Sequence, residues 1–319
     1  MFAALFPGQG SQHPGMGRFL YDNFKVAQEL FEEASDTLSL DFKRLCFEAS
    51  EAELALTKNT QSSLLLVSVA TYQSLKSAVD FVPLASSGHS VGEYAALVAA
   101  QAIPFGQAIQ AVRLRGEAMQ EAVPVGQGGM LAVMGMTSEQ VTQLCQWVES
   151  KSGLGPLEPA NFNAPGQVVI SGRQAAIDWL TEHYSPEVIQ PSPSRSKFIP
   201  LKVSAPFHCS LMGPAERAMA PELAQMDFVQ PSFPVVQNFT AQAEQEPEKL
   251  RHNLLKQICA PVRWIECVQT LKVLGVQKCL ELGPGRVLSG LVKKIDSDSF
   301  STFNINSLED LKTLEEVLK

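Results

Sequence analysis

Short apolar runs of strand length alternate along most of this chain with longer segments of helical periodicity. The clearest helical segments are residues 62–79 and 105–122, where apolar and polar side chains fall on different faces. The strand-like runs are residues 2–6, 81–85, 130–134, 167–171, 197–203, 235–238, 276–282 and 302–305. Strands that alternate with amphipathic helices usually pair in parallel, with the helices packed on the sheet faces. The sequence therefore predicts an α/β fold with a mostly parallel sheet.

One stretch, residues 128–203, has a different order of elements. It reads as a strand, a helix at 138–150, strands at 158–161 and 167–171, a helix at 173–183 and a last strand at 197–203. This is the β-α-β-β-α-β order of a ferredoxin-like unit. We therefore predict a small subdomain at 128–203. It would be inserted into a large, discontinuous α/β domain at 1–127 and 204–319.

Composition and charge exclude several classes of protein. The chain of 319 residues is 45% apolar and carries a formal net charge of −8. An acidic surface repels phosphates, so we expect neither nucleic acid nor a membrane as a partner. The six cysteines are dispersed, without Cys-x-x-Cys pairs or zinc-type spacing. We therefore expect reduced thiols, a cytoplasmic location and no bound metal. No apolar run approaches the length of a membrane span, which is about 18 residues or more.

A Gly-x-Ser-x-Gly motif, Gly88-His89-Ser90-Val91-Gly92, lies between a strand-like run and a helical segment at 93–100. Glycines at these positions permit a sharp strand-to-helix turn that exposes the serine hydroxyl. At the N-terminus of a helix, the dipole and free N–H groups favour developing negative charge, and the Val91 N–H is a natural oxyanion donor. We predict that Ser90 is a nucleophile that accepts an acyl group. The alternative is a turn that only links strand to helix.

A nucleophilic serine needs a base, and the chain has five histidines. His89 is adjacent to Ser90, and we expect it to point elsewhere. His183 and His252 lie in polar segments typical of the surface. His13 lies in a glycine-rich loop where it could approach a cleft. His208 follows a strand and a proline and precedes another helix, a position typical of a site residue, although a buried structural histidine is the alternative.

The acid of a hydrolase triad has no clear candidate. In α/β-hydrolases the chain order is serine, acid, histidine. The only aspartate between Ser90 and His208 is Asp178, inside a predicted helix, and no glutamate there ends a strand. A backbone carbonyl could orient His208 instead, holding its tautomer without supplying a charge.

The glycine-rich loop Phe6-Pro7-Gly8-Gln9-Gly10 follows the first strand-like run. A dinucleotide fingerprint would need glycine where the chain has His13, and the Gly-Lys-Ser/Thr ending of a phosphate loop is absent. We therefore reject both kinds of nucleotide loop and expect an oxyanion donor here. A second loop, Glu281-Leu282-Gly283-Pro284-Gly285, is expected to shape the mouth of the cleft.

Six motifs occur in order along the chain. They are Phe6-Pro7-Gly8-Gln9-Gly10-Ser11-Gln12, Gly88-His89-Ser90-Val91-Gly92-Glu93, Arg113-Leu114-Arg115-Gly116, Phe207-His208-Cys209-Ser210-Leu211-Met212, Pro261-Val262-Arg263-Trp264 and Glu281-Leu282-Gly283-Pro284-Gly285. Together they resemble the malonyl-CoA:acyl carrier protein transacylases, acyltransferases of fatty-acid and polyketide synthesis. The resemblance runs from Phe2 to about Ile295. It implies an α/β-hydrolase-like large domain with a ferredoxin-like insert.

The resemblance implies a role for each matching residue. Ser90 would be the nucleophile and His208 the base, and the backbone N–H groups of Gln9 and Val91 would form the oxyanion hole. Val91 stands where leucine is common in the family, but only its N–H is needed.

The remaining implied roles concern the acyl group and the orientation of the base. Arg115 would bind the malonyl carboxylate, Gln257 would offer its main-chain carbonyl to His208, and Gln61 would lie near the cleft. Arg113 and Arg115 are about 200° apart around a helix, so only one of them is expected to enter the site. An arginine fork matches a carboxylate in a bidentate manner.

The implied reaction transfers a malonyl group from malonyl-CoA, through a malonyl-serine, to the phosphopantetheine thiol of acyl carrier protein. No cofactor is implied beyond the coenzyme A thioester substrate, and we expect a monomer. The acidic carrier protein would meet a basic patch, for which Arg286, Lys293 and Lys294 are candidates. The alternatives are a serine hydrolase or thioesterase, an inactive module that binds carrier protein, and a transferase that loads a polyketide assembly line in trans.

Overall fold

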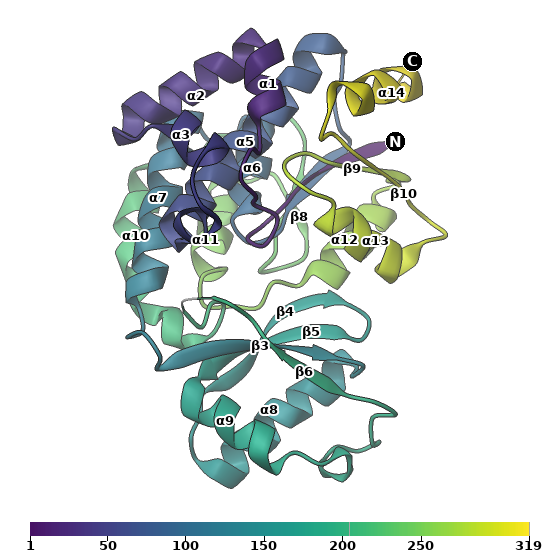
Figure 1. Ribbon diagram of the computed structural model, residues 1–319. Coiled ribbons are helices and arrows are strands. Elements are labelled where there is room, and N and C mark those ends of the chain that lie inside the picture. Colours follow the sequence, from purple (N-terminus) through teal and green to yellow (C-terminus); the bar gives the residue numbers. More distant parts are fainter. Residues whose placement is uncertain (204, 319) are drawn as a thin grey trace.

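A six-stranded sheet forms the centre of the larger part of the molecule in the computed structural model, which describes residues 1–203 and 205–318 (Figure 1). The strand order is β10-β9-β1-β2-β7-β8. The strands are β1 (Phe2–Phe6), β2 (Ala85–Gly88), β7 (Val235–Val236), β8 (Ala243–Glu244), β9 (Lys278–Glu281) and β10 (Ser301–Asn304). Within this described sheet every pair is parallel except β7 with β8. The prediction of an α/β fold with a mostly parallel sheet is confirmed.

Helices cover both faces of the large sheet, because its central strand is apolar on both sides. Ala4 and Phe6 of β1 pack into one core cluster, and Ala3 and Leu5 pack into another on the opposite face. The helices of this part are α1 (Arg18–Asn23), α2 (Lys25–Leu38), α3 (Phe42–Phe47), α4 (Glu51–Leu54), α5 (Thr57–Ala78), α6 (Gly92–Ala99), α7 (Phe105–Glu121), η2 (Ser210–Met212), α10 (Gly213–Gln225), α11 (Pro247–Lys256), α12 (Trp264–Val273), α13 (Val287–Asp296) and α14 (Leu308–Leu318).

A second, antiparallel sheet forms the smaller part, with the strand order β4-β5-β3-β6 among the described residues. Its elements are β3 (Gly128–Met134), α8 (Ser138–Ser152), β4 (Leu157–Ala164), β5 (Gln167–Arg173), α9 (Gln174–His183), η1 (Pro186–Val188) and β6 (Lys197–Pro200). Alternation along β3 buries Leu131 and Val133 under α8 and α9, which cover the sheet face turned away from the large part (Figure 1). Met130 points the other way, toward the large part. The element order is β-α-β-β-α-β, as the sequence indicates.

Several boundaries differ from the sequence prediction, and two strands show the physical reasons most clearly. The strand expected at 81–85 begins only at Ala85, because Pro83 cannot donate to a ladder and Phe81 is buried in the preceding loop. The last strand of the small sheet ends at Pro200 rather than at 203. Ser204, where the predicted large domain resumes, and Lys319, where it ends, lie outside the described residues.

The two parts are joined along the outer strand of the small sheet. Val262, in the loop before α12, forms an isolated parallel bridge with Asn161 of β4. The Val262 N–H donates to the Ala160 carbonyl at 2.8 Å, and the Phe162 N–H donates to the Val262 carbonyl at 2.9 Å. The small sheet is therefore hydrogen-bonded to the large part beside the cleft. Within 1–203 and 205–318, no helix has both the length and the apolar character needed to cross a bilayer.

Candidate active site

Ser90 stands at a sharp turn between β2 and α6. Its backbone φ is 53°, in the left-handed region. The glycines on either side cannot be replaced without a clash. A β-carbon on Gly88 would lie 2.0 Å from the Gly92 backbone, and one on Gly92 would lie 2.1 Å from the Phe6 carbonyl oxygen. The turn therefore depends on both glycines, and it lifts the Ser90 hydroxyl above the ends of the parallel strands.

The Ser90 hydroxyl lies against His208. Ser90 Oγ and His208 Nε2 are 2.7 Å apart, and His208 Nδ1 is 2.9 Å from the carbonyl oxygen of Gln257. A carbonyl can only accept, so Nδ1 carries the proton and Nε2 is left as the acceptor that faces the serine. The structure thus brings Ser90, His208 and the Gln257 carbonyl together in the order that the sequence resemblance implies.

Burial keeps the His208 imidazole neutral. The ring is 4% exposed, and desolvation, reinforced by the charge of Arg115, lowers the pKa of His208 to about 3. At neutral pH the side chain is therefore an unprotonated base, already hydrogen-bonded to the hydroxyl that it would deprotonate.

The Arg115 side chain extends from α7 to the Ser90 hydroxyl. Its guanidinium donates from Nη1 to Gln61 Oε1 at 2.8 Å, and from Nη2 to Gln257 Oε1 at 3.0 Å and to Ser90 Oγ at 3.1 Å. The residue is 0% exposed, and burial lowers its pKa. Among the described residues, no carboxylate lies within salt-bridge distance of this cation and its Nε has no partner. Because burying an unpaired cation is costly, this guanidinium is a candidate binding site for an anion.

Arg113 points away from the site, as the helical spacing predicts. It donates from Nη1 to Asn59 Oδ1 at 2.8 Å and from Nε to Glu117 Oε1 at 3.1 Å. The side chain is 16% exposed and pairs with a partly exposed carboxylate. Arg115 therefore belongs to the buried site, whereas Arg113, on another face of the same helix, forms a partly exposed ion pair.

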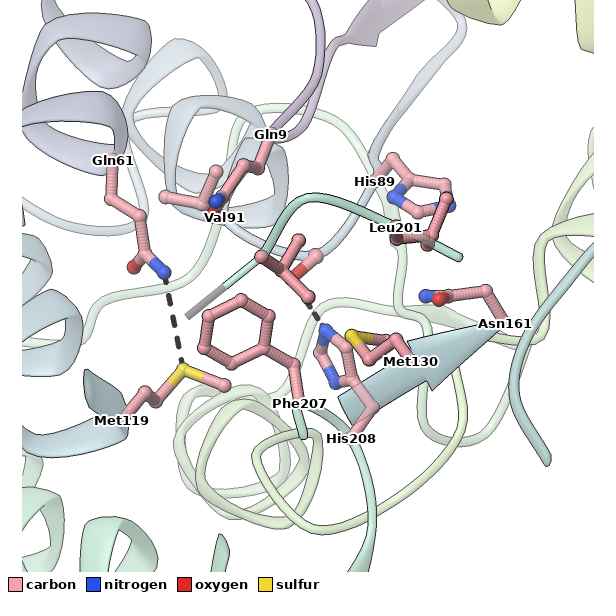
Figure 2. A pocket seen from close by; sticks show the side chains of 12 residues that line it. Gln9, Gln61, His89, Val91, Met119, Met130, Asn161, Leu201, Phe207 and His208 are labelled. Carbon is pink, nitrogen blue, oxygen red and sulfur yellow. Dashed lines mark hydrogen bonds between the residues drawn. The ribbon is translucent and has the colours of Figure 1, made fainter. Parts of the chain in front are cut away.

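A cavity of about 100 Å³ opens in front of Ser90. Figure 2 shows the side chains of Gln61, Met130 and His208 in its wall. The large part supplies polar side chains, including those of Gln61 and His208, and the small sheet supplies Met130. The lining residues are Gln9, Gln61, His89, Ser90, Val91, Met119, Met130, Asn161, Leu201, Val203, Phe207 and His208. Six of these residues are apolar and six are polar, so the cavity combines apolar walls with convergent polar groups, as is typical of small-molecule sites.

Gln9 and Val91 both line the cavity, in loops that follow β1 and β2. These strands are adjacent and parallel, so their carboxyl ends meet at one edge of the sheet. Among the described residues, neither backbone N–H has an acceptor. Two unpaired N–H groups beside a nucleophile are the arrangement that stabilises an oxyanion.

The other histidines lie away from Ser90 Oγ. His89 lines the cavity, but its Nε2 lies 2.8 Å from Asn163 Oδ1 and its ring packs on Trp264. His183 and His252 are exposed, as predicted. His13 lines a separate cavity.

The loop at 281–285 does not line the cavity in front of Ser90. Gly283 and Pro284 instead line the separate cavity that contains His13. Glu281 accepts from the backbone N–H groups of Leu288 and Ser289 at 2.9 and 2.7 Å, and so caps α13. The expectation that this loop shapes the mouth of the cleft stays a prediction, and what the structure describes is its role at the start of a helix.

Two residues of the site were not identified from the sequence. Asn238 accepts from the Ser90 N–H at 2.7 Å and donates to the Gly88 carbonyl at 2.8 Å, which fixes the turn. Glu93 is buried behind that turn. Asn238 ends a predicted strand-like run, but its place at the site appears only once β7 lies beside β2 in the sheet.

The geometry defines an enzyme in which a serine–histidine pair faces a buried cation, and comparison with known proteins assigns its class. Residues 4–288 match the family described as the acyl transferase domain. The chain belongs to this family and is an acyltransferase.

The particular relatives are malonyl transferases. The chain is 41% identical to the malonyl CoA-acyl carrier protein transacylase of Staphylococcus aureus, over 97% of each chain. It is 40% identical to that of Bacillus subtilis, over 99% of this chain and 97% of the relative. The acyl carrier protein S-malonyltransferase of Vibrio cholerae superposes with a TM-score of 0.91 at 38% identity, covering 98% of this chain and 99% of that one.

A further solved structure contains a partner. It is a malonyl-transacylase in complex with its type II PKS acyl-carrier protein. That enzyme superposes with a TM-score of 0.91 at 42% identity, over 99% of both chains.

Proposed function

We propose that this enzyme transfers a malonyl group from malonyl-CoA to the phosphopantetheine thiol of acyl carrier protein in fatty-acid biosynthesis. The names of relatives that match nearly the whole chain support the substrates. One observation carries the choice of acyl group: the buried Arg115 guanidinium lies 3.1 Å from Ser90 Oγ and has no protein carboxylate beside it among the described residues. The free carboxylate of a malonyl group would supply the missing charge.

The first half-reaction would load the serine. His208 Nε2 takes the proton of Ser90 Oγ, which attacks the thioester carbonyl and forms a tetrahedral intermediate. The N–H groups of Gln9 and Val91 stabilise its oxyanion. The carbon–sulfur bond then breaks, and the coenzyme A thiolate takes the proton back from His208. The products are malonyl-serine and free coenzyme A.

The second half-reaction would discharge the serine to the carrier protein. The phosphopantetheine thiol gives its proton to His208 and attacks the malonyl-serine carbonyl. The carbon–oxygen bond breaks, and Ser90 Oγ recovers the proton from His208. The Gln257 carbonyl would hold the imidazole in one tautomer through both steps.

Arg115 and Gln61 would orient the acyl group. Gln61 Oε1 already holds one edge of the guanidinium, and an incoming carboxylate would take the position beside Ser90. Pairing with that carboxylate would also offset the positive charge that lowers the pKa of His208, so the base would become stronger when a malonyl donor is bound.

The finer description of the fold belongs to the same proposal. We infer an α/β-hydrolase-like domain at 1–127 and 204–319 and a ferredoxin-like insert at 128–203. The element order and the antiparallel β4-β5-β3-β6 sheet support the insert. The parallel sheet and the tight turn at Ser90 support the relation of the large domain to hydrolases.

Partners and setting are inferred on the same basis. The reaction as written needs no cofactor beyond the thioester, and we propose a cytoplasmic monomer that binds neither nucleic acid nor membrane. The net charge of −8 and the free cysteines support this setting. Arg286, Lys293 and Lys294 are exposed at and just before α13, which supports them as contacts for an acidic carrier protein.

Intact-mass measurement after incubation with malonyl-, methylmalonyl- and acetyl-CoA tests the proposal. We expect one malonyl group on the wild-type enzyme and none on Ser90→Ala. The loaded enzyme should keep its acyl group in buffer and lose it to a pantetheine thiol. Rapid loss to water would instead identify a hydrolase, and label on the Ser90→Ala variant would place the nucleophile elsewhere.

A further inference from the structure

A buried carboxylate lies directly behind the nucleophile, and the reaction steps above do not use it. Glu93 is 0% exposed and sits in the first turn of α6. Its Oε1 accepts from Gln237 Nε2 at 3.0 Å. Its Oε2 accepts from the Asn238 N–H at 2.7 Å and from Gln257 Nε2 at 2.9 Å. Every one of these partners is a neutral donor, so the carboxylate is held by amides rather than by a cation.

The bond to Glu93 at 2.9 Å, together with a longer one from Gln257 Nε2 to the Ser90 carbonyl oxygen at 3.2 Å, determines which way the Gln257 amide faces. A carboxylate only accepts, so the NH₂ group of Gln257 must point to Glu93 and its Oε1 must point the other way. That oxygen accepts from Arg115 Nη2 at 3.0 Å. The backbone carbonyl of the same residue holds His208 Nδ1 at 2.9 Å. Gln257 therefore links the carboxylate to both the cation and the base.

The arrangement also places a negative charge near Arg115 without pairing the two directly. The charge of Glu93 raises the pKa of Arg115, against the larger opposite effect of burial. One amide side chain lies between the two charges. A direct ion pair would occupy the guanidinium and compete with a ligand carboxylate. A link through the Gln257 amide offsets part of the cost of burying Arg115 and leaves the guanidinium available to a ligand carboxylate.

We propose that Glu93 is a positioning residue for acyl transfer: it fixes the orientation of the Gln257 amide, which holds the Arg115 guanidinium beside Ser90 for the carboxylate of the acyl donor. This inference rests on the proposed malonyl transfer. It adds a residue that lies outside the cavity lining and acts on substrate choice through another side chain.

The variant Glu93→Gln tests this directly, because it keeps the size of the side chain and changes its hydrogen-bonding character. The Asn238 N–H and Gln257 Nε2 donate to the same carboxylate oxygen, so the amide oxygen of the variant takes that position and accepts from both as a neutral, weaker acceptor. The Gln257 amide is then held less firmly, and Arg115 loses the nearby negative charge that offsets part of the cost of its burial. We expect kcat/KM for malonyl-CoA loading to fall about tenfold or more, mainly through KM, which is the effect of one lost charge-assisted hydrogen bond. Loading from acetyl-CoA, which lacks the carboxylate, should change less than about threefold.

Gln237→Met is the matched control. It removes a donor to the other carboxylate oxygen, Oε1, and leaves the Glu93–Gln257–Arg115 connection in place. We expect this variant to keep the wild-type ratio of malonyl to acetyl loading. A merely structural role for Glu93 would reduce loading from both donors equally and lower the melting temperature in both variants.

The pH dependence of the wild-type enzyme gives a second measurement that needs no variant. Burial raises the pKa of Glu93 to about 7, and the protonated form resembles glutamine. The ratio of malonyl to acetyl loading should therefore fall as the pH drops through about 7, and Glu93→Gln should lack this change. The other titratable groups around Glu93 are Arg115 on α7, Tyr94 on α6 and Cys267 on α12. Burial raises the pKa of Tyr94 and Cys267, so neither ionises near neutral pH.

The outcomes separate the two proposals. A wild-type enzyme that loads acetyl and malonyl groups equally well would overturn the proposed function itself. A wild-type enzyme that prefers malonyl-CoA, together with a Glu93→Gln variant of unchanged preference and KM, would overturn only the role of Glu93. If that variant does not fold, a malonyl-to-acetyl ratio of the wild type that stays constant across neutral pH overturns the role.

Discussion

Arg115 is a charged side chain that the fold has removed from water and left without a protein anion among the described residues. Its hydrogen bonds are to the amide oxygens of Gln61 and Gln257 and the hydroxyl of Ser90, and it lies over the Tyr94 ring at 6.0 Å from the centroid. Neutral dipoles compensate a buried cation only in part. Under the proposed function, the selection of an acyl donor with a free carboxylate would depend on this residue, for which the neighbouring Arg113 offers an internal comparison.

Replacing Arg115 by alanine should abolish the preference for a carboxylate. We expect malonyl loading to fall about a hundredfold or more, since a buried, hydrogen-bonded charge contact is lost. Activity with acetyl-CoA should rise relative to malonyl-CoA. Arg113→Ala is the control, because it removes an ion pair with Glu117 and a hydrogen bond to Asn59, both away from Ser90, and the ratio of the two donors should not change. An unchanged ratio in Arg115→Ala would contradict the assignment.

The protonation state of His208 gives a second prediction for a single residue. Its pKa is lowered to about 3, so the base form persists as the pH falls and is lost only near that value. With acetyl-CoA as donor, kcat/KM for loading should stay flat down to about pH 5. A histidine with its ordinary pKa of about 6.5 would lose about thirtyfold by then. Stopped-flow measurement of coenzyme A release at each pH gives kcat/KM for loading.

Sequence reasoning identified the side chains that face the acyl group more readily than those behind them. Ser90, His208 and Arg115 belong to motifs whose residue types and spacing indicate a chemical role, and the structure brings the three side chains together. Glu93 and Asn238 act from behind the turn, and their contacts join positions about 145 residues apart in the chain. Local pattern carries no information on such contacts, so these residues emerge only when β7 is placed beside β2.

At the scale of secondary structure, the turn between β2 and α6 is the most constrained element. Gly92 lies against the Phe6 carbonyl oxygen, which would be 2.1 Å from a β-carbon. We expect Gly92→Ala to lower the free energy of unfolding by about 3 kcal/mol or more, in the range of severe overpacking. Urea unfolding followed by circular dichroism measures the change.

Gly290 in α13 is the control for that substitution. A β-carbon there would meet nothing within 4 Å. Gly290→Ala should leave stability unchanged or raise it by about 0.5–1 kcal/mol, because alanine restricts the unfolded chain and suits a helix. Equal destabilisation by both substitutions would show that the close approach at Gly92 is unimportant.

Close packing around β2 explains why the sequence analysis placed this strand at 81–85 and not at Ala85–Gly88. β2 has the sequence Ala-Ser-Ser-Gly and is fully buried. Small residues are needed there because β1 and β7 flank it and α6 packs closely on it. Such residues have little strand propensity, whereas the neighbouring run at 81–85 is more apolar. Tertiary packing, and not local preference, makes this segment a strand.

For the whole molecule, the unpaired cation should couple acylation to stability. A malonyl group on Ser90 places a carboxylate beside Arg115, whereas an acetyl group does not. We expect the malonyl-enzyme to melt a few degrees above the acetyl-enzyme, as a gain of about 1–2 kcal/mol implies for a chain of this size. Differential scanning calorimetry of the two acyl forms measures this, and Arg115→Ala should remove the difference. Identical melting temperatures in the wild type would argue against the contact.

The bridge between Val262 and β4 has a consequence for how such enzymes diverge. Ser90, His208 and Arg115 all lie outside the small sheet, whereas Met130 and Asn161 of the cavity wall lie on it. The bridge fixes this wall against the large part without sharing any hydrogen bond with the reacting groups. Mutations that reshape the wall can therefore alter which acyl groups fit while the proton transfers stay the same. Substrate preference can then change through mutations in the small sheet, while Ser90 and His208 stay as they are.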